Sequence, residues 1–164
     1  MNCSTPEGKG LIVIKKVLVV DDEPSIRKLL SVALGNRGFE VLEAEDGVAA
    51  LGAITAEKPD LVVLDVMMPG MTGHEVHDQL RSRPETKELP VLFLSAAGTF
   101  EEQHRNIASD PFADYLPKPF KPSEVADHID AMLDPTKQVE VQRERGRREA
   151  KLSKIVEIMH RDRG

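Results

Sequence analysis

The sequence predicts an α/β protein in which five strand–helix repeats form a parallel sheet with helices on both faces. Two observations support this fold class. Short runs of apolar residues alternate along the chain with segments of helical periodicity. The chain has 164 residues, of which 40% are hydrophobic, which is enough core for one domain with an appendage.

The first repeat begins with Val17–Val20, a continuous β-branched run of the kind expected for a strand buried on both faces. Pro24 suits the first turn of a helix, and acidic residues just before it fit the positive end of a helix dipole. Gly38 is placed to end that helix. The apolar residues between them follow helical spacing: Ile26, Leu29, Leu30, Ala33 and Leu34.

The second and third repeats have the same form. A short strand is expected at Glu40–Glu43, followed by a turn and a helix at Val48–Glu57 that Pro59 ends. Leu61–Leu64 is a second fully apolar strand. A proline- and glycine-containing loop then leads to a helix at His74–Arg81.

The last two repeats complete the pattern. Val91–Leu94 predicts another buried strand, and Glu101–Ala108 predicts a helix with few apolar positions. Ala113–Leu116 predicts the fifth strand, and apolar residues from Val125 to Leu133 indicate a closing helix.

Charge and composition divide the chain into three parts and exclude several classes of protein. We expect a flexible lead-in at 1–15, a folded domain at 16–134 and a basic, helical tail at 135–164. The net charge is −6, and the acidic excess lies before residue 137, which argues against direct DNA binding by the domain. The sequence predicts no membrane span, and the single cysteine, Cys3, excludes a disulfide framework, so we expect a cytoplasmic protein.

The tail carries one short apolar stripe on its expected helix, formed by Leu152, Ile155, Val156 and Met159. The stripe covers about two turns, too few for a sustained coiled coil. Two interpretations stay open: contacts with a target or a second copy of the chain, giving a homodimer, or a solvated extension.

Polar and charged residues follow four of the predicted strands. Asp21 and Asp22 follow the first, Asp65 the third, Ser95 the fourth and Lys118 the fifth. The carboxyl ends of parallel strands lie at one edge of a sheet, so these side chains converge there. Clustered carboxylates repel one another and favour Mg²⁺ as a neutralising ion. A carboxylate is also a nucleophile toward a phosphoryl group, whose oxygens the lysine and the hydroxyl would stabilise.

Four motifs in this order resemble the receiver domain of a two-component response regulator. They read VLVVDDEPSIRKLL, PDLVVLDVMMPGMTG, LPVLFLSA and ADYLPKPF, and the resemblance runs from Lys16 to about Leu133. It implies a flavodoxin-like three-layer fold with a parallel sheet of strand order 2-1-3-4-5.

The resemblance also implies a role for each site residue. Asp65 corresponds to the phospho-acceptor. The metal ligands would be Asp21, Asp22, Asp65 and the backbone carbonyl of Met67. Ser95 corresponds to the hydroxyl that moves onto the phosphoryl group, Lys118 to the lysine of the family motif, and Tyr115 to the aromatic switch. The Lys118–Pro119 bond would be cis, which a following proline allows.

The implied function is that of a phospho-accepting signalling switch rather than a turnover enzyme. A sensor histidine kinase or a phosphotransfer protein would supply the phosphoryl group, in a Mg²⁺-dependent reaction that the domain itself accelerates. The product would hydrolyse slowly, and the switch would act on an unidentified protein target.

Two other classes of protein are alternatives on a fold of this type. An aspartyl-phosphate phosphatase on a similar fold places a second aspartate two residues after the nucleophile, where this chain has Met67. A flavodoxin-like flavin-binding protein needs a Ser/Thr/Gly-rich phosphate loop after the first strand. Here Asp21, Asp22 and Glu23 occupy that position and would repel a phosphate in the absence of a metal.

Overall fold

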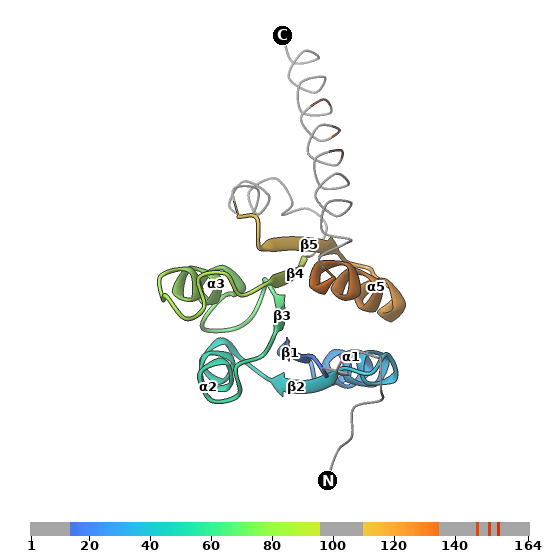
Figure 1. The fold of residues 1–164 in the computed structure, drawn as a ribbon, viewed down its shortest axis with the longest axis horizontal. Coiled ribbons are helices and arrows are strands. Elements are labelled where there is room, and N and C mark those ends of the chain that lie inside the picture. Colours follow the sequence, from blue (N-terminus) through green and yellow to red (C-terminus); the bar gives the residue numbers. More distant parts are fainter. Residues whose placement is uncertain (1–13, 96–109, 135–146, 148–150, 152–153, 155–164) are drawn as a thin grey trace, which may run out of the picture.

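The computed structural model describes residues 14–95 and 110–134, together with the single residues 147, 151 and 154. Strands and helices alternate along the two continuous ranges (Figure 1). The strands are β1 (Lys16–Val20), β2 (Glu40–Ala44), β3 (Leu61–Asp65), β4 (Val91–Ser95) and β5 (Ala113–Pro117). The helices are α1 (Pro24–Asn36), α2 (Gly47–Glu57), α3 (Gly73–Arg81) and α5 (Pro122–Leu133).

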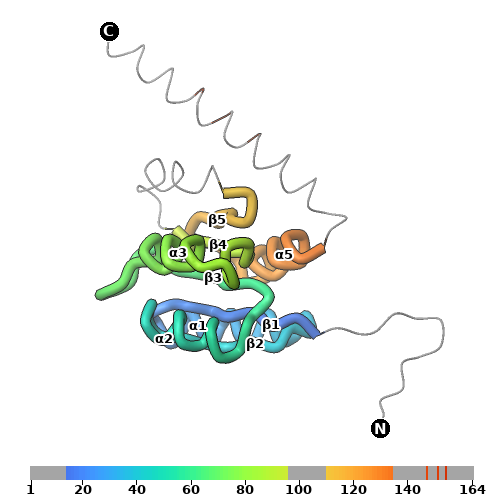
Figure 2. Tube along the Cα trace, turned by 60° about the vertical axis from the view of Figure 1, so that its left-hand side comes forward, coloured from blue at the N-terminus to red at the C-terminus, as the bar shows by residue number. Residues whose placement is uncertain are grey.

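The five strands form one parallel sheet in the order β2-β1-β3-β4-β5. Figure 2 shows this order as a colour sequence, with the blue and cyan strands β1 and β2 on one side and β5 on the other. The order reverses at β1, because the chain moves outward to β2 and then crosses back to β3. Loops at the carboxyl ends of β1 and β3 therefore lie side by side, as expected at the switch point of such a sheet.

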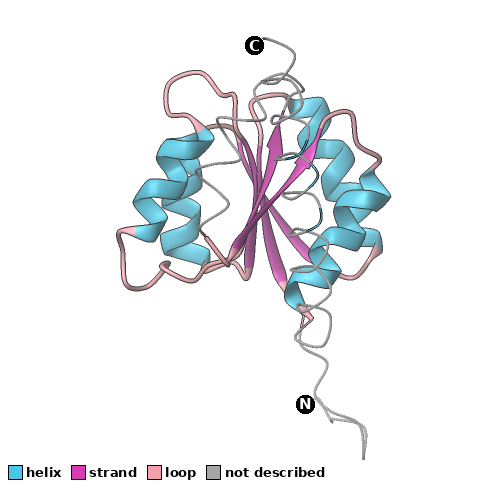
Figure 3. Ribbon diagram, turned by 90° about the horizontal axis from the view of Figure 1, so that it is seen from above, coloured by secondary structure: helices cyan, strands magenta, loops and turns pink. Residues whose placement is uncertain are grey.

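Helices cover both faces of the sheet and create two separate cores. Figures 1 and 3 show α2 and α3 on one face and α1 and α5 on the other. Because strand side chains alternate between faces, Leu18 and Val20 pack with α2 and α3, whereas Val17 and Val19 pack with α1 and α5. The strands β1, β3 and β4 are buried on both faces, which explains their continuous apolar runs.

The predicted sheet and helices are confirmed within the described residues, with shifts of one to three residues at their ends. The strand predicted at Glu40–Glu43 extends to Ala44, and it is half-exposed because β2 is an edge strand. Gly38 lies just after α1 with a φ of 94°, as its predicted role in ending the helix requires. Residues 1–13 of the predicted lead-in, the helix expected at Glu101–Ala108 and most of the tail lie outside the described residues.

One ion-pair cluster joins the two helices on the same face of the sheet. Arg37, at the end of α1, donates to Asp127 at 2.6 Å and to Asp130 at 2.8 Å, both on α5. All three side chains are exposed, so these contacts contribute little stability.

Within the part of the chain that the structure describes, no helix has the length and apolar character to cross a membrane.

Candidate functional site

Asp21 and Asp22 follow β1 directly, but their side chains occupy different environments. Asp21 is buried, and its Oδ1 accepts a hydrogen bond from the backbone N–H of Glu23 at 2.9 Å. Among the described residues, its Oδ2 is buried without a hydrogen-bond partner. Asp22 is exposed. A buried carboxylate oxygen without a partner is costly, so this atom is suited to a bound cation.

Asp65 is the last residue of β3 and is only 4% exposed. Its Oδ1 accepts hydrogen bonds from the backbone N–H of Met67 at 3.2 Å and from Nζ of Lys118 at 3.4 Å. Gly73, at the start of α3, packs so closely that a Cβ there would overlap the backbone carbonyl of Asp65. A glycine at position 73 therefore lets the β3–α3 loop fold back against the Asp65 backbone.

The three carboxylates converge as predicted. One oxygen from each of Asp21, Asp22 and Asp65 lies within 4.8 Å of the other two. The donors are all hard oxygen atoms, which is the ligand set that Mg²⁺ prefers. The unpartnered Oδ2 of Asp21 completes the fit, so these residues suit a magnesium ion.

The electrostatics of the site reflect this crowding. Burial, opposed by the Glu23 hydrogen bond and reinforced by the Asp65 charge, raises the pKa of Asp21 to about 6. Burial also raises the pKa of Asp65, although Lys118 and the Met67 N–H act in the opposite direction. Without a cation, Asp21 and Asp65 therefore hold a proton more tightly than ordinary carboxylates do.

Lys118 and Ser95 complete the site from two neighbouring strands. Ser95 is the last residue of β4 and is buried, and its carbonyl accepts a hydrogen bond from the backbone N–H of Lys118 at 2.7 Å. The Lys118–Pro119 peptide bond is cis, as the resemblance implied. The Lys118 ammonium lies beside Asp65, with its Nζ 3.4 Å from Oδ1.

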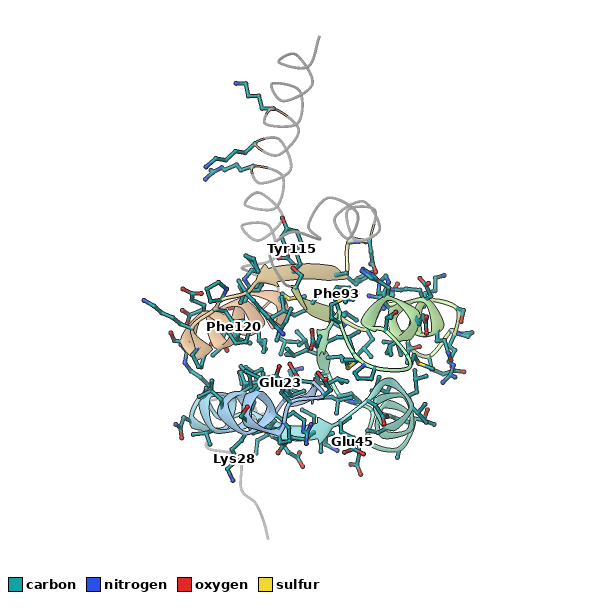
Figure 4. The ribbon with its side chains drawn as sticks, turned by 180° about the vertical axis from the view of Figure 1, so that it is seen from behind. Glu23, Lys28, Glu45, Phe93, Tyr115 and Phe120 are labelled. Carbon is teal, nitrogen blue, oxygen red and sulfur yellow. The ribbon has the colours of Figure 1, made fainter. Side chains whose placement is uncertain are left out.

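Tyr115 lies on β5, opposite Phe93 of β4 in the strand register, and both rings belong to the core on the α2 and α3 side (Figure 4). Its side chain is only 3% exposed. The side chain of the predicted switch residue is therefore buried.

All the predicted site residues lie within the described ranges. The structure brings together the carboxylates of Asp21, Asp22 and Asp65, and it places the Lys118 ammonium beside Asp65. Ser95 shares the same sheet edge, and Met67 touches Asp65 through its N–H while its side chain is 62% exposed. The use of the Met67 carbonyl as a metal ligand stays a prediction.

Sequence reasoning missed two sets of polar contacts. Arg27 of α1 reaches the backbone carbonyl of Asp21 through Nη1 at 2.7 Å. His77 and Arg81 of α3 both contact Oδ2 of Asp110 at 2.6 Å. His77 and Asp110 are 33 residues apart in the sequence, and no sequence pattern indicates that they meet.

The raised pKa of Asp21 predicts that removing its charge stabilises the fold when no divalent cation is present. Because the folded protein binds the Asp21 proton more tightly than the unfolded chain does, protonated Asp21 favours the folded state. This contribution to the free energy of unfolding is fully present below pH 3.8, the ordinary pKa of an aspartate, and it is lost as the pH rises through about 6. At pH 7.5 in EDTA, we expect Asp21→Asn to raise the free energy of unfolding by about 1–2 kcal/mol. At pH 4 the difference should shrink. Urea denaturation at the two pH values measures both.

Asp46→Asn is the matched control for that experiment, because it also removes one negative charge near the sheet edge. Asp46 caps α2 by accepting a hydrogen bond from Ala49, and asparagine caps equally well. We expect no comparable gain in stability from this variant. A destabilised Asp21→Asn protein at pH 7.5 would contradict the assignment of repulsion and burial as the cause.

Comparison with known proteins shows which protein family shares this sequence and fold. Residues 17–130 match the sequence profile of the response regulator receiver domain. The chain is 39% identical over 124 residues to the phosphate regulon transcriptional regulatory protein PhoB of Pseudomonas aeruginosa, covering 74% of this chain and 53% of that protein. It is 45% identical over 120 residues to the alkaline phosphatase synthesis regulator PhoP of Bacillus subtilis, covering 73% and 48%. The chain thus spans about half the length of these curated relatives.

Solved structures give the same result for the fold. The chemotaxis protein CheY4 of Vibrio cholerae superposes with a TM-score of 0.68 at 34% identity, covering 74% of this chain and all of that chain. A response regulator from Chloroflexus aurantiacus gives a TM-score of 0.68 at 33% identity, covering 74% and 98%.

Proposed function

This chain belongs to the response regulator receiver domain family, and we propose that it accepts a phosphoryl group on Asp65 in a Mg²⁺-dependent reaction. One observation carries the residue assignment. Asp65 is the carboxylate that stands both within 4.8 Å of the two other acidic side chains and 3.4 Å from the Lys118 ammonium. Asp65 is thus placed between the proposed metal ligands and a fixed positive charge.

In the proposed reaction, a carboxylate oxygen of Asp65 bonds to phosphorus as the bond from phosphorus to the donor breaks. The donor is a phosphohistidine, or acetyl phosphate in a test tube. Asp21, Asp22, Asp65 and the Met67 carbonyl would hold Mg²⁺, which neutralises charge on the phosphoryl oxygens when bound. The Lys118 ammonium supplies a fixed positive charge on the other side of Asp65.

Ser95 and Tyr115 are the proposed switch residues. Ser95 is the last residue of β4, and from there its hydroxyl would hydrogen-bond to the new phosphoryl group. Tyr115 is paired with Phe93 of β4 in the strand register, so a movement at the end of β4 would change the packing of the tyrosine side chain. The proposed output is a change in the surface around β4 and β5.

The partners follow from this chemistry and from the family. We propose that a sensor histidine kinase or a phosphotransfer protein donates the phosphoryl group in the cytoplasm, and that the signal passes to a protein target. The domain would catalyse its own phosphorylation and hydrolyse the product slowly. Contacts with a second copy through the tail, and the absence of direct DNA binding, stay predictions; two of the relatives described above are named as transcriptional regulators.

The test is uptake of a phosphoryl group from a small donor. The protein is incubated with acetyl phosphate in MgCl₂ or in EDTA, and intact mass spectrometry is recorded. We expect a mass increase of one phosphoryl group with Mg²⁺ and none with EDTA. Equal uptake in both, or none in either, would contradict the proposal.

Met67 gives a prediction about the lifetime of the phosphorylated state. Hydrolysis needs a water molecule held in line with the phosphorus atom, and the exposed Met67 side chain offers no hydrogen bond to hold it. We expect Met67→Asn to accelerate loss of the phosphoryl group by roughly tenfold, because the amide can orient water. Met67→Leu, which changes shape without adding a polar atom, should leave the rate within about twofold of wild type. The rate is followed as decay of the phosphorylated mass after the donor is removed, and equal rates in the two variants would refute the prediction.

A further inference from the structure

Arg27 makes two hydrogen bonds to the turn that carries the acidic pair. Its guanidinium Nη1 donates to the backbone carbonyl of Asp21 at 2.7 Å. Its own backbone N–H donates to the carbonyl of Glu23 at 3.2 Å. A single residue in the first turns of α1 therefore fixes both ends of the short turn that carries Asp21 and Asp22.

The Arg27 side chain is itself held in place. It is only 15% exposed, and its Nε lies 3.5 Å from the carboxylate of Glu43 on β2. The neighbouring Lys28 is exposed and points away from the sheet, as Figure 4 shows. A charged group that is largely buried needs partners, and Arg27 finds them in Glu43 and in the Asp21 carbonyl.

The turn sets the direction of the Asp21 carboxylate. Oδ1 of Asp21 is bound to the N–H of Glu23, which leaves Oδ2 buried and without a hydrogen-bond partner among the described residues. Rotation of the Asp21–Asp22 peptide would move both carboxylates relative to Asp65. The hydrogen bond from Arg27 opposes that rotation, because it fixes the carbonyl of the same peptide.

We propose that Arg27 is a positioning residue that pre-orients Asp21 and Asp22 for Mg²⁺, with Glu43 keeping its guanidinium in place. The inference rests on the proposed function, since it concerns the ligands of the same site. Groups that orient metal ligands without touching the metal commonly affect its affinity by tenfold or more. The role requires a hydrogen-bond donor at the end of the side chain, and does not depend on charge alone.

The test measures Mg²⁺ affinity without any phosphoryl donor. MgCl₂ is titrated into ¹⁵N-labelled protein, and the dissociation constant is taken from amide shifts in the NMR spectrum. We expect Arg27→Met to weaken Mg²⁺ binding by about tenfold and Arg27→Lys, which retains one donor, by less. Glu43→Gln should weaken it only slightly, because the Asp21 contact remains.

Arg37→Met is the matched control, because it removes the same charge from the other end of α1. Arg37 binds Asp127 and Asp130 on α5, and we expect its loss to leave Mg²⁺ affinity within twofold of wild type. Arg27→Met and Arg27→Lys proteins that bind Mg²⁺ as tightly as wild type would overturn the inference. Equal weakening by Arg27→Met and Arg37→Met would also overturn it, since charge or stability alone would then explain the effect.

The same titration separates this inference from the proposed function. If Asp65→Asn or Asp22→Asn binds Mg²⁺ as tightly as wild type, the proposed metal site is wrong. If those variants lose binding while both Arg27 variants retain it, only the role of Arg27 is wrong. If the NMR spectrum of Arg27→Met shows that this variant does not fold, the Mg²⁺ affinity of Arg27→Lys still tests the inference.

Discussion

Asp65→Asn is expected to take up no phosphoryl group from acetyl phosphate in MgCl₂, whereas the wild-type protein becomes labelled. Asparagine has nearly the same shape and can still accept the hydrogen bonds from Met67 and Lys118. It lacks the charged oxygen that attacks phosphorus, so the loss reflects chemistry rather than folding. Intact mass spectrometry, with peptide mapping of the wild-type adduct, measures the result.

Asp60→Asn is the matched control for that substitution. Asp60 stands immediately before β3, at the opposite end of the strand from Asp65, and its Oδ2 accepts a hydrogen bond from the N–H of Lys16 at 2.8 Å. Asparagine keeps an acceptor there, so we expect normal labelling. Labelling of Asp65→Asn to the wild-type level would show that another residue is the acceptor.

Lys118→Met is expected to slow phosphoryl uptake by about 100-fold while leaving Mg²⁺ binding in place. The ammonium lies 3.4 Å from Asp65 Oδ1, where in the proposed reaction it would stabilise the charge that develops on the transferring group. The side chains of methionine and lysine have similar length, so the change removes the charge with little loss of packing. Initial rates of labelling at saturating Mg²⁺ measure the effect.

Lys121→Met separates a local from a general effect of charge in that experiment. Lys121 is exposed, precedes α5 by one residue and lies only three positions after Lys118. We expect it to be labelled at the wild-type rate. A Lys118→Met protein with a normal rate would mean that the metal alone stabilises the transferring group, and would remove Lys118 from the site.

Two further features connect the core of the domain to its outer elements. Asp114, buried on β5, accepts a hydrogen bond from His128 of α5 at 2.7 Å and from the N–H of Tyr115 at 2.8 Å. Asp110, just before β5, is held by His77 and Arg81 of α3, and these contacts lower the pKa of its carboxyl against the opposing effect of burial. The amino-terminal end of β5 is therefore fixed by carboxylate contacts to helices on opposite faces of the sheet.

The sequence alone was sufficient for the sheet and for the grouping of the candidate site residues at one of its edges. Runs such as Val17–Val20 and Leu61–Leu64 identify strands buried on both faces, because only such strands lack alternating polar residues. The carboxyl ends of parallel strands share one edge, so a polar residue after each strand predicts convergence without coordinates. Asp21, Asp22, Asp65 and Lys118 were found in this way, and the structure brings them together.

Tertiary structure alone decided how these side chains are oriented and held. The Arg27 contact with the Asp21 carbonyl depends on the path of a turn and the start of a helix, and the pairing of His77 with Asp110 depends on packing across β4. Hydrophobic periodicity records which face of an element is buried, but it carries no information about which polar atoms meet. Asp21 and Asp22 are alike in sequence; folding buries one and leaves the other exposed, and that difference raises the pKa of Asp21.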